Sequence, residues 1–160
     1  MREAKRDDGW SMADLRTGRQ EQELACLLAD DHEQLLDASE GLLQSEGIRV
    51  LGKASTGLGV LQLLEEQPIT AVVVDLRLPD LNGLEVARRV AEIARRKTAV
   101  IIYTSHADEH IVGEALDAGA RGVVLKNGSP ENLLAAMASV AAGEIYIDPR
   151  LRRNGAKTSS

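Results

Sequence analysis

The sequence predicts an α/β fold, a doubly wound sheet of five parallel strands with helices on both faces. Two observations support this prediction. Short apolar runs alternate with longer stretches of helical periodicity through most of the chain, which is typical of repeated strand–helix units. Four of the runs consist almost entirely of Ala, Val, Ile and Leu, as expected for strands that are covered on both faces.

Each expected strand coincides with one apolar run. The four uninterrupted runs predict central or well-shielded strands, at 24–29, 71–74, 99–103 and 122–125. The run 48–53 differs because it contains Arg49 and Lys53. It therefore predicts a strand at the edge of the sheet, with one side facing solvent.

The expected helices occupy the intervals after these strands. The first contains four leucines at helical spacing and stops at Gly47. The others are expected at about 56–66, 83–96, 107–118 and 130–142. In the last of these, Ser129 is the expected N-cap, Pro130 the first helical residue and Gly143 the stop. In the helix at 83–96, five apolar residues are expected to point inward: Leu84, Val86, Ala87, Val90 and Ile93.

The length of 160 residues suits one packed domain with short tails. We expect a flexible leader at 1–22, the domain at 23–148 and a basic linker or tail at 149–160. Nineteen acidic residues outweigh ten basic ones in 24–149, which argues against a nucleic-acid surface on the domain.

The sequence also predicts the compartment of the protein. No stretch approaches the roughly 20 apolar residues of a membrane span, and the first residues are polar rather than signal-like. The single Cys26 lies in an apolar run and is interpreted as a small buried hydrophobe in a reducing environment. We therefore expect a cytoplasmic protein without membrane contact.

Four of the expected strands end in residues that carry chemistry. The first is followed by Asp30 and Asp31, the third by Asp75, the fourth by Thr104 and the fifth by Lys126. Ligands of such sheets bind at the carboxyl ends of the strands, so these side chains should converge. Clustered carboxylates favour a hard divalent cation such as Mg²⁺. A metal, an ammonium, a hydroxyl and a nucleophilic carboxylate together suit phosphoryl transfer.

The motifs around these residues resemble the receiver domains of two-component response regulators. They are Ala29-Asp30-Asp31-His32, the segment 74–83 around Asp75, Tyr103-Thr104-Ser105, and Gly122-Val123-Val124-Leu125-Lys126. The resemblance covers roughly residues 24–148. It implies the flavodoxin-like receiver fold with strand order 2-1-3-4-5.

The resemblance also implies the roles of the site residues. Asp75 would accept a phosphoryl group from a phosphohistidine of a sensor histidine kinase, and Thr104 and Lys126 would bind phosphoryl oxygens. The acyl phosphate would then hydrolyse slowly. The chain would thus be a switch that catalyses only its own phosphorylation and dephosphorylation, not a metabolic enzyme.

A bound Mg²⁺ is implied by the same resemblance. Asp31 and Asp75 would ligate the ion directly, together with the backbone carbonyl of Arg77. Asp30 would contribute through a water molecule.

The last third of the chain is similar to the NarL/LuxR-type subfamily, on the segments 118–122, 129–136 and 142–149. Members carry a C-terminal helix-turn-helix domain, so the resemblance implies transcriptional control through a DNA-binding domain absent from this chain. It also implies a homodimer surface on the fourth helix, fifth strand and fifth helix. Val123 departs from the family, because many receivers have a Tyr or Phe there that moves with Thr104. The switch would then depend on backbone shifts.

Three other patterns in the sequence resemble metal or nucleotide motifs but are incomplete. His106, Glu109 and His110 match an H-x-x-E-H zinc motif but lack an evident third ligand. The segment 80–83 lacks the closing Glu of a calcium loop and is interpreted as a turn capping the helix at 83–96. Gly57-Leu58-Gly59 lacks the final glycine of a dinucleotide fingerprint.

Two alternatives to the switch remain open. A magnesium phosphatase of the haloacid-dehalogenase type would require Asp-x-Asp after its first strand, where this chain has Asp30-Asp31. The other alternative is a receiver-like domain that takes no phosphate and acts by constitutive protein–protein contacts.

Overall fold

The computed structural model of the protein describes residues 24–94 and 98–152. The leader expected at 1–22 and the end of the expected tail, 153–160, lie outside the described residues. The strands are β1 (Ala25–Ala29), β2 (Arg49–Ala54), β3 (Ala71–Val74), β4 (Ala99–Thr104), β5 (Gly122–Leu125) and β6 (Tyr146–Ile147). The helices are α2 (Glu33–Ser45), α3 (Gly57–Leu64), α4 (Gly83–Ala94), α5 (Glu109–Asp117) and α6 (Glu131–Ala141).

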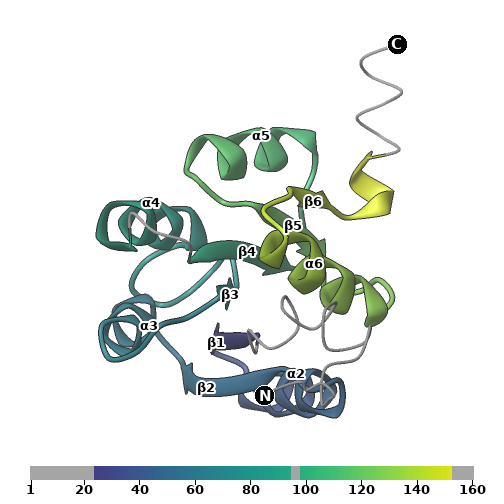
Figure 1. The fold of residues 1–160 in the computed structure, drawn as a ribbon. Helices are drawn as coiled ribbons and strands as arrows, with labels where there is room; N and C mark the ends of the chain where they lie inside the picture. The colour runs from purple at the N-terminus through teal and green to yellow at the C-terminus, as the bar shows by residue number, and fades with distance from the viewer. Residues whose placement is uncertain (1–23, 95–97, 153–160) are drawn as a thin grey trace, which may run out of the picture.

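The strands form one parallel sheet in the order β2-β1-β3-β4-β5-β6. Its first five strands have the predicted order 2-1-3-4-5, and the fold class is confirmed (Figure 1). The sixth strand was not expected. Tyr146 and Ile147 pair with Gly122 and Val123 of β5, and a segment of two residues is too short to show the periodicity of a strand.

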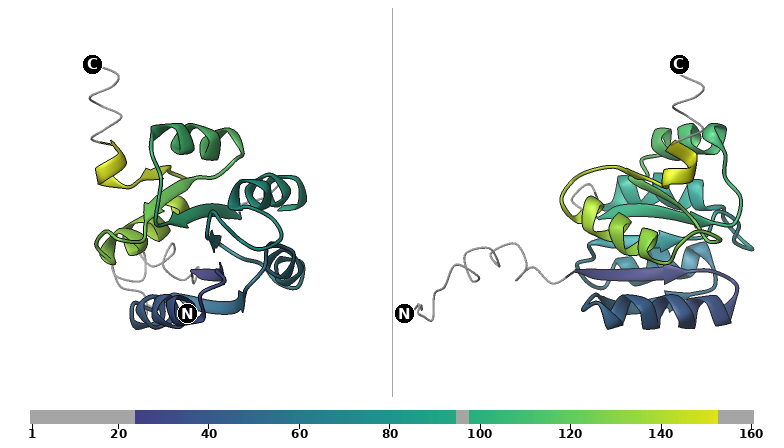
Figure 2. Two further views of the ribbon diagram at one scale, coloured as in Figure 1. Left: turned by 180° about the vertical axis from the view of Figure 1, so that it is seen from behind. Right: turned by 90° about the vertical axis from the view of Figure 1, so that its right-hand side faces the viewer.

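Helices cover both faces of the sheet, so the domain has three layers (Figures 1 and 2). Side chains of α3, α4 and α5 pack on one face, around Val60, Val86 and Ala115. Side chains of α2 and α6 pack on the other face, around Leu43 and Met137. The central strands β1, β3 and β5 are buried along their whole length, which explains their uninterrupted apolar sequences.

The expected edge strand and the expected role of Cys26 are both confirmed. β2 lies at the edge of the sheet, where Arg49 and Lys53 are exposed and the other residues are half-buried. The Cys26 side chain is fully buried, and desolvation raises the pKa of its thiol to about 12. Such a thiol stays protonated and packs as an apolar group.

The C-terminal ends of three helices lie where glycines predicted them, whereas the predicted start of α6 is one residue off. Gly47, Gly119 and Gly143 all adopt positive φ just after a helix, a conformation that favours glycine. α6 begins one residue later than expected, because Pro130 rather than Ser129 occupies the N-cap position. The Ser129 hydroxyl instead bonds the Glu131 carboxylate.

Two further expectations for the helices need correction. Ile93 was expected to point inward, but its side chain is 43% exposed at the last turn of α4. α5 begins at Glu109 rather than near 107, because Asp108 caps it and accepts a hydrogen bond from the Ile111 N–H at 3.0 Å.

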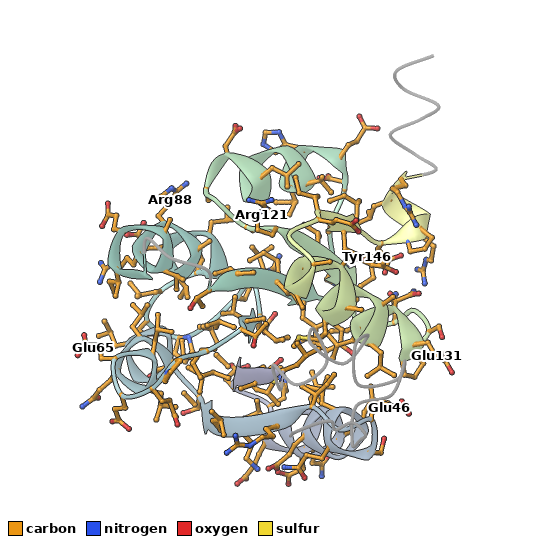
Figure 3. All side chains as sticks on the ribbon, in the orientation of Figure 1. Glu46, Glu65, Arg88, Arg121, Glu131 and Tyr146 are labelled. Atoms are coloured by element: carbon orange, nitrogen blue, oxygen red, sulfur yellow. The ribbon has the colours of Figure 1, made fainter. Side chains whose placement is uncertain are left out.

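The outer surfaces of the helices are polar. Figure 3 shows Glu46, Glu65, Arg88 and Glu131 pointing away from the core, and all four are exposed. Across the described ranges, no helix is both long and apolar enough to cross a membrane.

Candidate phosphorylation site

Side chains from four strand ends meet at the carboxyl edge of the sheet, as the sequence predicted. Asp30 follows β1, Asp75 follows β3 and Lys126 follows β5, while Thr104 is the last residue of β4. Asp30, Asp75 and Thr104 are all less than 10% exposed, which is unusual for polar residues. Burying them requires partners within the site.

The Lys126 ammonium is the central partner of these carboxylates. It forms a close ion pair with Oδ2 of Asp30 and lies 3.4 Å from Oδ2 of Asp75. The Lys126 N–H donates to the Thr104 carbonyl at 2.8 Å, which fixes the start of the lysine side chain beside β4. One ammonium, from the end of β5, thus contacts two buried carboxylates from the ends of the adjacent strands β1 and β3.

The environment of Asp75 makes its carboxylate less acidic than an ordinary one. Burial raises the pKa of Asp75, and the negative charge of Asp30 raises it further. The Lys126 ammonium and the Arg77 N–H act in the opposite direction but do not cancel the effect of burial. Perturbed carboxylates of this kind are concentrated at functional sites.

Thr104 and the residue two positions after it form a small hydrogen-bonded turn. Thr104 Oγ1 accepts from the His106 N–H and donates to the His106 carbonyl, both at 3.3 Å. These long hydrogen bonds hold the hydroxyl at the edge of the site. Val123, the other expected switch residue, is fully buried in β5 and lies outside the polar cluster.

An acidic cluster beside Asp75 has the donor atoms for a hard cation. One ligand atom each from Asp30, Asp31, His32 and Asp75 lies within 4.8 Å of the others. Three carboxylates face a single ammonium there, so the site keeps net negative charge. Oxygen donors and uncompensated charge fit Mg²⁺, which would polarise and shield a phosphoryl group when bound.

His32 is a member of this cluster to which the sequence assigned no role. Its Nδ1 lies 3.1 Å from both Asp30 Oδ1 and Asp31 Oδ1, and its side chain is 74% exposed. The main-chain N–H of His32 also donates to Asp30 Oδ1 at 2.8 Å, which orients that carboxylate. The motif Asp30-Asp31-His32 contained this residue, but a histidine beside a magnesium site has no general sequence signal.

The loop after β3 places Arg77 next to the acceptor. The Arg77 main-chain N–H is close enough to the Asp75 carboxylate to act against the rise of its pKa. The role of the Arg77 carbonyl as a metal ligand remains a prediction.

Gly83 allows the same loop to fold back on the acceptor. A Cβ on Gly83 would lie 2.7 Å from the Asp75 carbonyl oxygen, and the Gly83 N–H donates to the Leu76 carbonyl at 2.8 Å. Any larger residue would push the start of α4 away from the strand that carries Asp75.

The segment 80–83 caps two helices rather than one. Asn82 Oδ1 accepts from the Glu85 N–H at 2.9 Å and so caps α4, as expected. The Asp80 carboxylate caps α3 instead, accepting from the N–H groups of Gly57 and Leu58 at 2.8 and 2.9 Å. Asp80 therefore ties the loop of the acceptor to a neighbouring helix.

The histidines of the H-x-x-E-H pattern do not form a metal site in the part of the chain that the structure describes. His110 instead pairs with Glu114, with 3.4 Å between Nε2 and Oε2. Among the described residues, potential metal ligands gather in the acidic cluster around Asp75.

Comparison with known proteins identifies the family. The model of the response regulator receiver domain matches residues 26–138. The chain belongs to the response regulator receiver family. Among the curated relatives are the response regulator UvrY of Escherichia coli, 32% identical over 125 residues, and the nitrate/nitrite response regulator NarL of Escherichia coli, 35% identical over 126 residues. These matches cover 76% and 78% of this chain but 56% and 58% of the relatives, so the chain spans little more than half their length.

Solved receiver structures have the same fold. A LuxR-family response regulator from Aurantimonas sp. is 26% identical with a TM-score of 0.82, and the match covers 86% of this chain and 99% of that one. The receiver domain of a putative NarL regulator from Mycobacterium tuberculosis is 27% identical with a TM-score of 0.71, covering 76% and 98%. The receiver is thus of the NarL/LuxR type that the sequence indicated.

Proposed function

We propose that this receiver domain is a phosphorylation-dependent signalling switch, with Asp75 as the acceptor of a phosphoryl group. The observation that carries the proposal is the buried Asp75 carboxylate, with the Lys126 ammonium 3.4 Å away and the carboxylates of Asp30 and Asp31 beside it. A nucleophile, a fixed cation and a metal-binding cluster are the parts that phosphoryl transfer requires.

Each side chain has a distinct part in the proposed reaction. A carboxylate oxygen of Asp75 attacks phosphorus, the P–N bond of a phosphohistidine breaks, and the imidazole leaves with its electron pair. The Lys126 ammonium neutralises one phosphoryl oxygen, and the Thr104 hydroxyl donates to another after leaving the His106 carbonyl. Water later cleaves the acyl phosphate, which returns the Asp75 carboxylate and releases inorganic phosphate. Asp31, Asp75 and the Arg77 carbonyl would hold a Mg²⁺ ion directly and Asp30 would hold it through water, and the ion would supply charge neutralisation when bound.

The partners in this proposal follow from the family. The phosphoryl donor is a sensor histidine kinase in the cytoplasm, and the output is transcriptional control through a DNA-binding domain outside this chain. Two RcsB dimers bound to two parallel DNAs are among the solved structures with this fold. A homodimer through α5, β5 and α6 is the corresponding proposal for this chain. We assign it no catalytic activity beyond its own phosphorylation and dephosphorylation.

Intact-mass spectrometry tests the assignment of Asp75. Incubation with acetyl phosphate and Mg²⁺ should add one phosphoryl group to the wild-type chain, and EDTA should prevent the addition. Asp75→Asn should abolish it. Asp80→Asn is the matched control, because Asp80 lies in the same loop but bonds main-chain N–H groups of α3. This variant should still be phosphorylated.

Two outcomes would contradict the proposal. A mass increase that persists in Asp75→Asn would place the acceptor elsewhere. No mass increase in the wild-type chain, together with no Mg²⁺-dependent binding of beryllofluoride, would favour a receiver that acts by constitutive protein contacts.

A further inference from the structure

A third buried carboxylate, Asp148, lies outside the acidic cluster and binds the residue before Lys126. Asp148 follows β6 and is completely buried, although its sequence position among Ile147, Pro149 and Arg150 gave no indication of a role. Its Oδ2 accepts a hydrogen bond from the Leu125 N–H at 2.9 Å, and its Oδ1 accepts from the Arg150 N–H at 3.0 Å. Two main-chain donors therefore satisfy this buried anion.

The hydrogen bond to Leu125 places Asp148 one residue from the lysine of the site. The Asp148 N–H donates to the Val123 carbonyl at 2.8 Å, so the main chain of Asp148 continues the ladder between β6 and β5. Its side chain then takes the next donor of β5, the Leu125 N–H, in place of a strand carbonyl. The N–H of Leu125, the last residue before Lys126, is thus bound to the C-terminal segment, while Leu125 stays paired with Thr104 of β4 on its other side.

The residue after Lys126 is bound to the same segment. The Arg150 guanidinium donates to the Asn127 carbonyl at 3.3 Å and lies 3.4 Å from Asn127 Oδ1. Residues 149–152 form a helical turn whose Leu151 is 4% exposed in the core under α3, α4 and α5. The C-terminal segment therefore holds Lys126 from both sides, at Leu125 and at Asn127, and is itself anchored in the core.

Arg150 also lines a pocket whose other residues include direct sequence neighbours of the site residues. The pocket has a volume of about 390 Å³, and Arg77, Ser105, His106 and Asn127 also line it. Arg77 follows the acceptor by two residues and His106 follows Thr104 by two. Because Arg150 is hydrogen-bonded to Asn127, a displacement of Lys126 that moves Asn127 would also move Arg150 in that pocket.

We propose that Asp148 is a positioning residue for Lys126, and that the docking of segment 148–152 is energetically coupled to phosphoryl binding in the site. The inference rests on the proposed phosphorylation of Asp75. Lys126 must turn part of its interaction from Asp30 to a phosphoryl oxygen. Its main chain is held by the Thr104 carbonyl and, through Leu125 and Asn127, by the C-terminal segment. Coupling between two sites is reciprocal, so loosening the segment weakens phosphoryl binding and phosphoryl binding changes the segment.

This coupling supplies a route for the signal that does not need an aromatic residue at position 123. Val123 has no aromatic ring that could move on phosphorylation, but its carbonyl accepts a hydrogen bond from the Asp148 N–H. A shift of β5 at the phosphate end is transmitted to 148–152 through three main-chain contacts, at Val123, Leu125 and Asn127.

Beryllofluoride binding with Mg²⁺, followed by calorimetry on the full chain, tests the proposal. Asp148→Asn keeps the size of the side chain but replaces one acceptor oxygen by a donor, and should weaken beryllofluoride binding roughly three- to tenfold. Arg150→Ala should weaken it in the same direction. The matched control is Arg152→Ala, since Arg152 is in the same helical turn but lies over the Tyr146 ring, 5.8 Å from its centroid. That variant should bind as the wild type does.

A double-mutant cycle distinguishes positioning from general loosening of the fold. In the Lys126→Ala background, Asp148→Asn should cause no further loss of beryllofluoride affinity, because its effect acts through the lysine. An additive effect in the cycle would reduce Asp148 to a structural residue.

Amide hydrogen exchange provides an independent measurement. Beryllofluoride should change the exchange of peptides covering 148–152 in the wild-type chain. Unchanged exchange there, with unchanged affinity in Asp148→Asn and Arg150→Ala, would overturn the coupling while leaving phosphorylation of Asp75 intact. If the wild-type chain bound no beryllofluoride, the proposed function itself would fail.

Discussion

At the scale of single residues, Asp75 is held in an environment that opposes its ionised form. Its carboxylate is buried, and the neighbouring Asp30 repels it, so its pKa is raised despite the Lys126 ammonium. When the pKa of a carboxyl group is higher in the folded state than in the unfolded state, ionising the group lowers the free energy of unfolding. This cost grows between the two pKa values and is complete above the folded-state pKa. The cost is absent below the unfolded pKa of about 3.9.

Replacing this carboxylate should therefore stabilise the domain at neutral pH. Asp75→Asn should raise the free energy of unfolding by about 1 kcal/mol at pH 7 in the absence of Mg²⁺, as removal of strained functional groups commonly does. The gain should shrink as the pH is lowered towards 4. Urea denaturation at several pH values measures both effects. Asp37→Asn serves as the control, because Asp37 forms a surface ion pair with Lys53 and should contribute little. A destabilised Asp75→Asn at neutral pH would contradict this account.

In the metal-free site, the same pKa direction sets the pH at which protons begin to compete with Mg²⁺ and with phosphoryl transfer for Asp75. Only the ionised Asp75 can attack phosphorus, and its raised pKa means that it protonates at higher pH than an ordinary aspartate. Phosphorylation by acetyl phosphate should therefore slow on acidification before most exposed carboxylates titrate. Initial rates of mass increase between pH 8 and pH 5 measure this, with the hydrolysis of acetyl phosphate alone as a control.

At the scale of elements, the loop between β3 and α4 decides where the acceptor lies. Gly83 lets α4 begin against the Asp75 carbonyl, while Asp80 ties the loop to the first turn of α3. The sequence predicted this loop as a turn, and the cap on α4 could be inferred from Asn82. The link to α3 could not, because the Gly57 and Leu58 N–H groups lie more than 20 residues away in the sequence and give no side-chain pattern.

Glycine substitutions test the close approach of α4 to β3. Gly83→Ala should destabilise the domain and weaken beryllofluoride binding, since its Cβ would lie 2.7 Å from the Asp75 carbonyl oxygen. Gly113→Ala is a matched control in the interior of α5, where nothing lies within 4 Å of the added Cβ. It should stabilise the protein by about 0.5–1 kcal/mol. Equal effects of the two substitutions in urea denaturation would exclude a special role for Gly83.

The cap on α3 should be visible in stability and not in metal affinity. Hydrogen bonds from Leu58, Gly57 and Leu81 hold the pKa of Asp80 below its usual value. Its contribution to stability is therefore complete above about pH 3.9 and is lost as the pH falls through the lower, folded-state pKa. Asp80→Ala should cost about 1 kcal/mol at pH 7 in urea denaturation. Asp80→Asn should recover part of that, and a change in Mg²⁺ affinity in either variant would argue against this separation.

At the scale of the whole molecule, a binding event at the acidic cluster should stabilise the entire fold. The ligands come from the ends of β1 and β3, two central strands of one sheet. At a Mg²⁺ concentration one hundred times its Kd, the free energy of unfolding should rise by about 2.7 kcal/mol. The increase should vanish in Asp31→Asn combined with Asp75→Asn and persist in Asp108→Asn, whose carboxylate caps α5. Thermal unfolding at constant ionic strength measures the difference.

The whole-molecule view also explains how far the sequence could be interpreted. The convergence of Asp30, Asp75, Thr104 and Lys126 follows from the apolar runs and the rule that parallel strands end at one edge. The strand order was implied by the resemblance to receiver domains and is confirmed for the first five strands. β6 could not be predicted, because the strand has only two residues. The role of Asp148 could not be predicted either, because its carboxylate accepts hydrogen bonds from main-chain N–H groups, which nearly every residue offers. Ile93 was misplaced because helical periodicity continues past the point where the core ends.

The two outer strands of the sheet have a consequence for self-association. β2 carries Arg49 and Lys53 along one outer edge, and β6, at the other, is two residues long and is followed within two positions by Pro149. Charged residues, short length and nearby proline all discourage the addition of a further strand. The sheet is therefore protected from polymerising into extended β-structure through either of its outer strands.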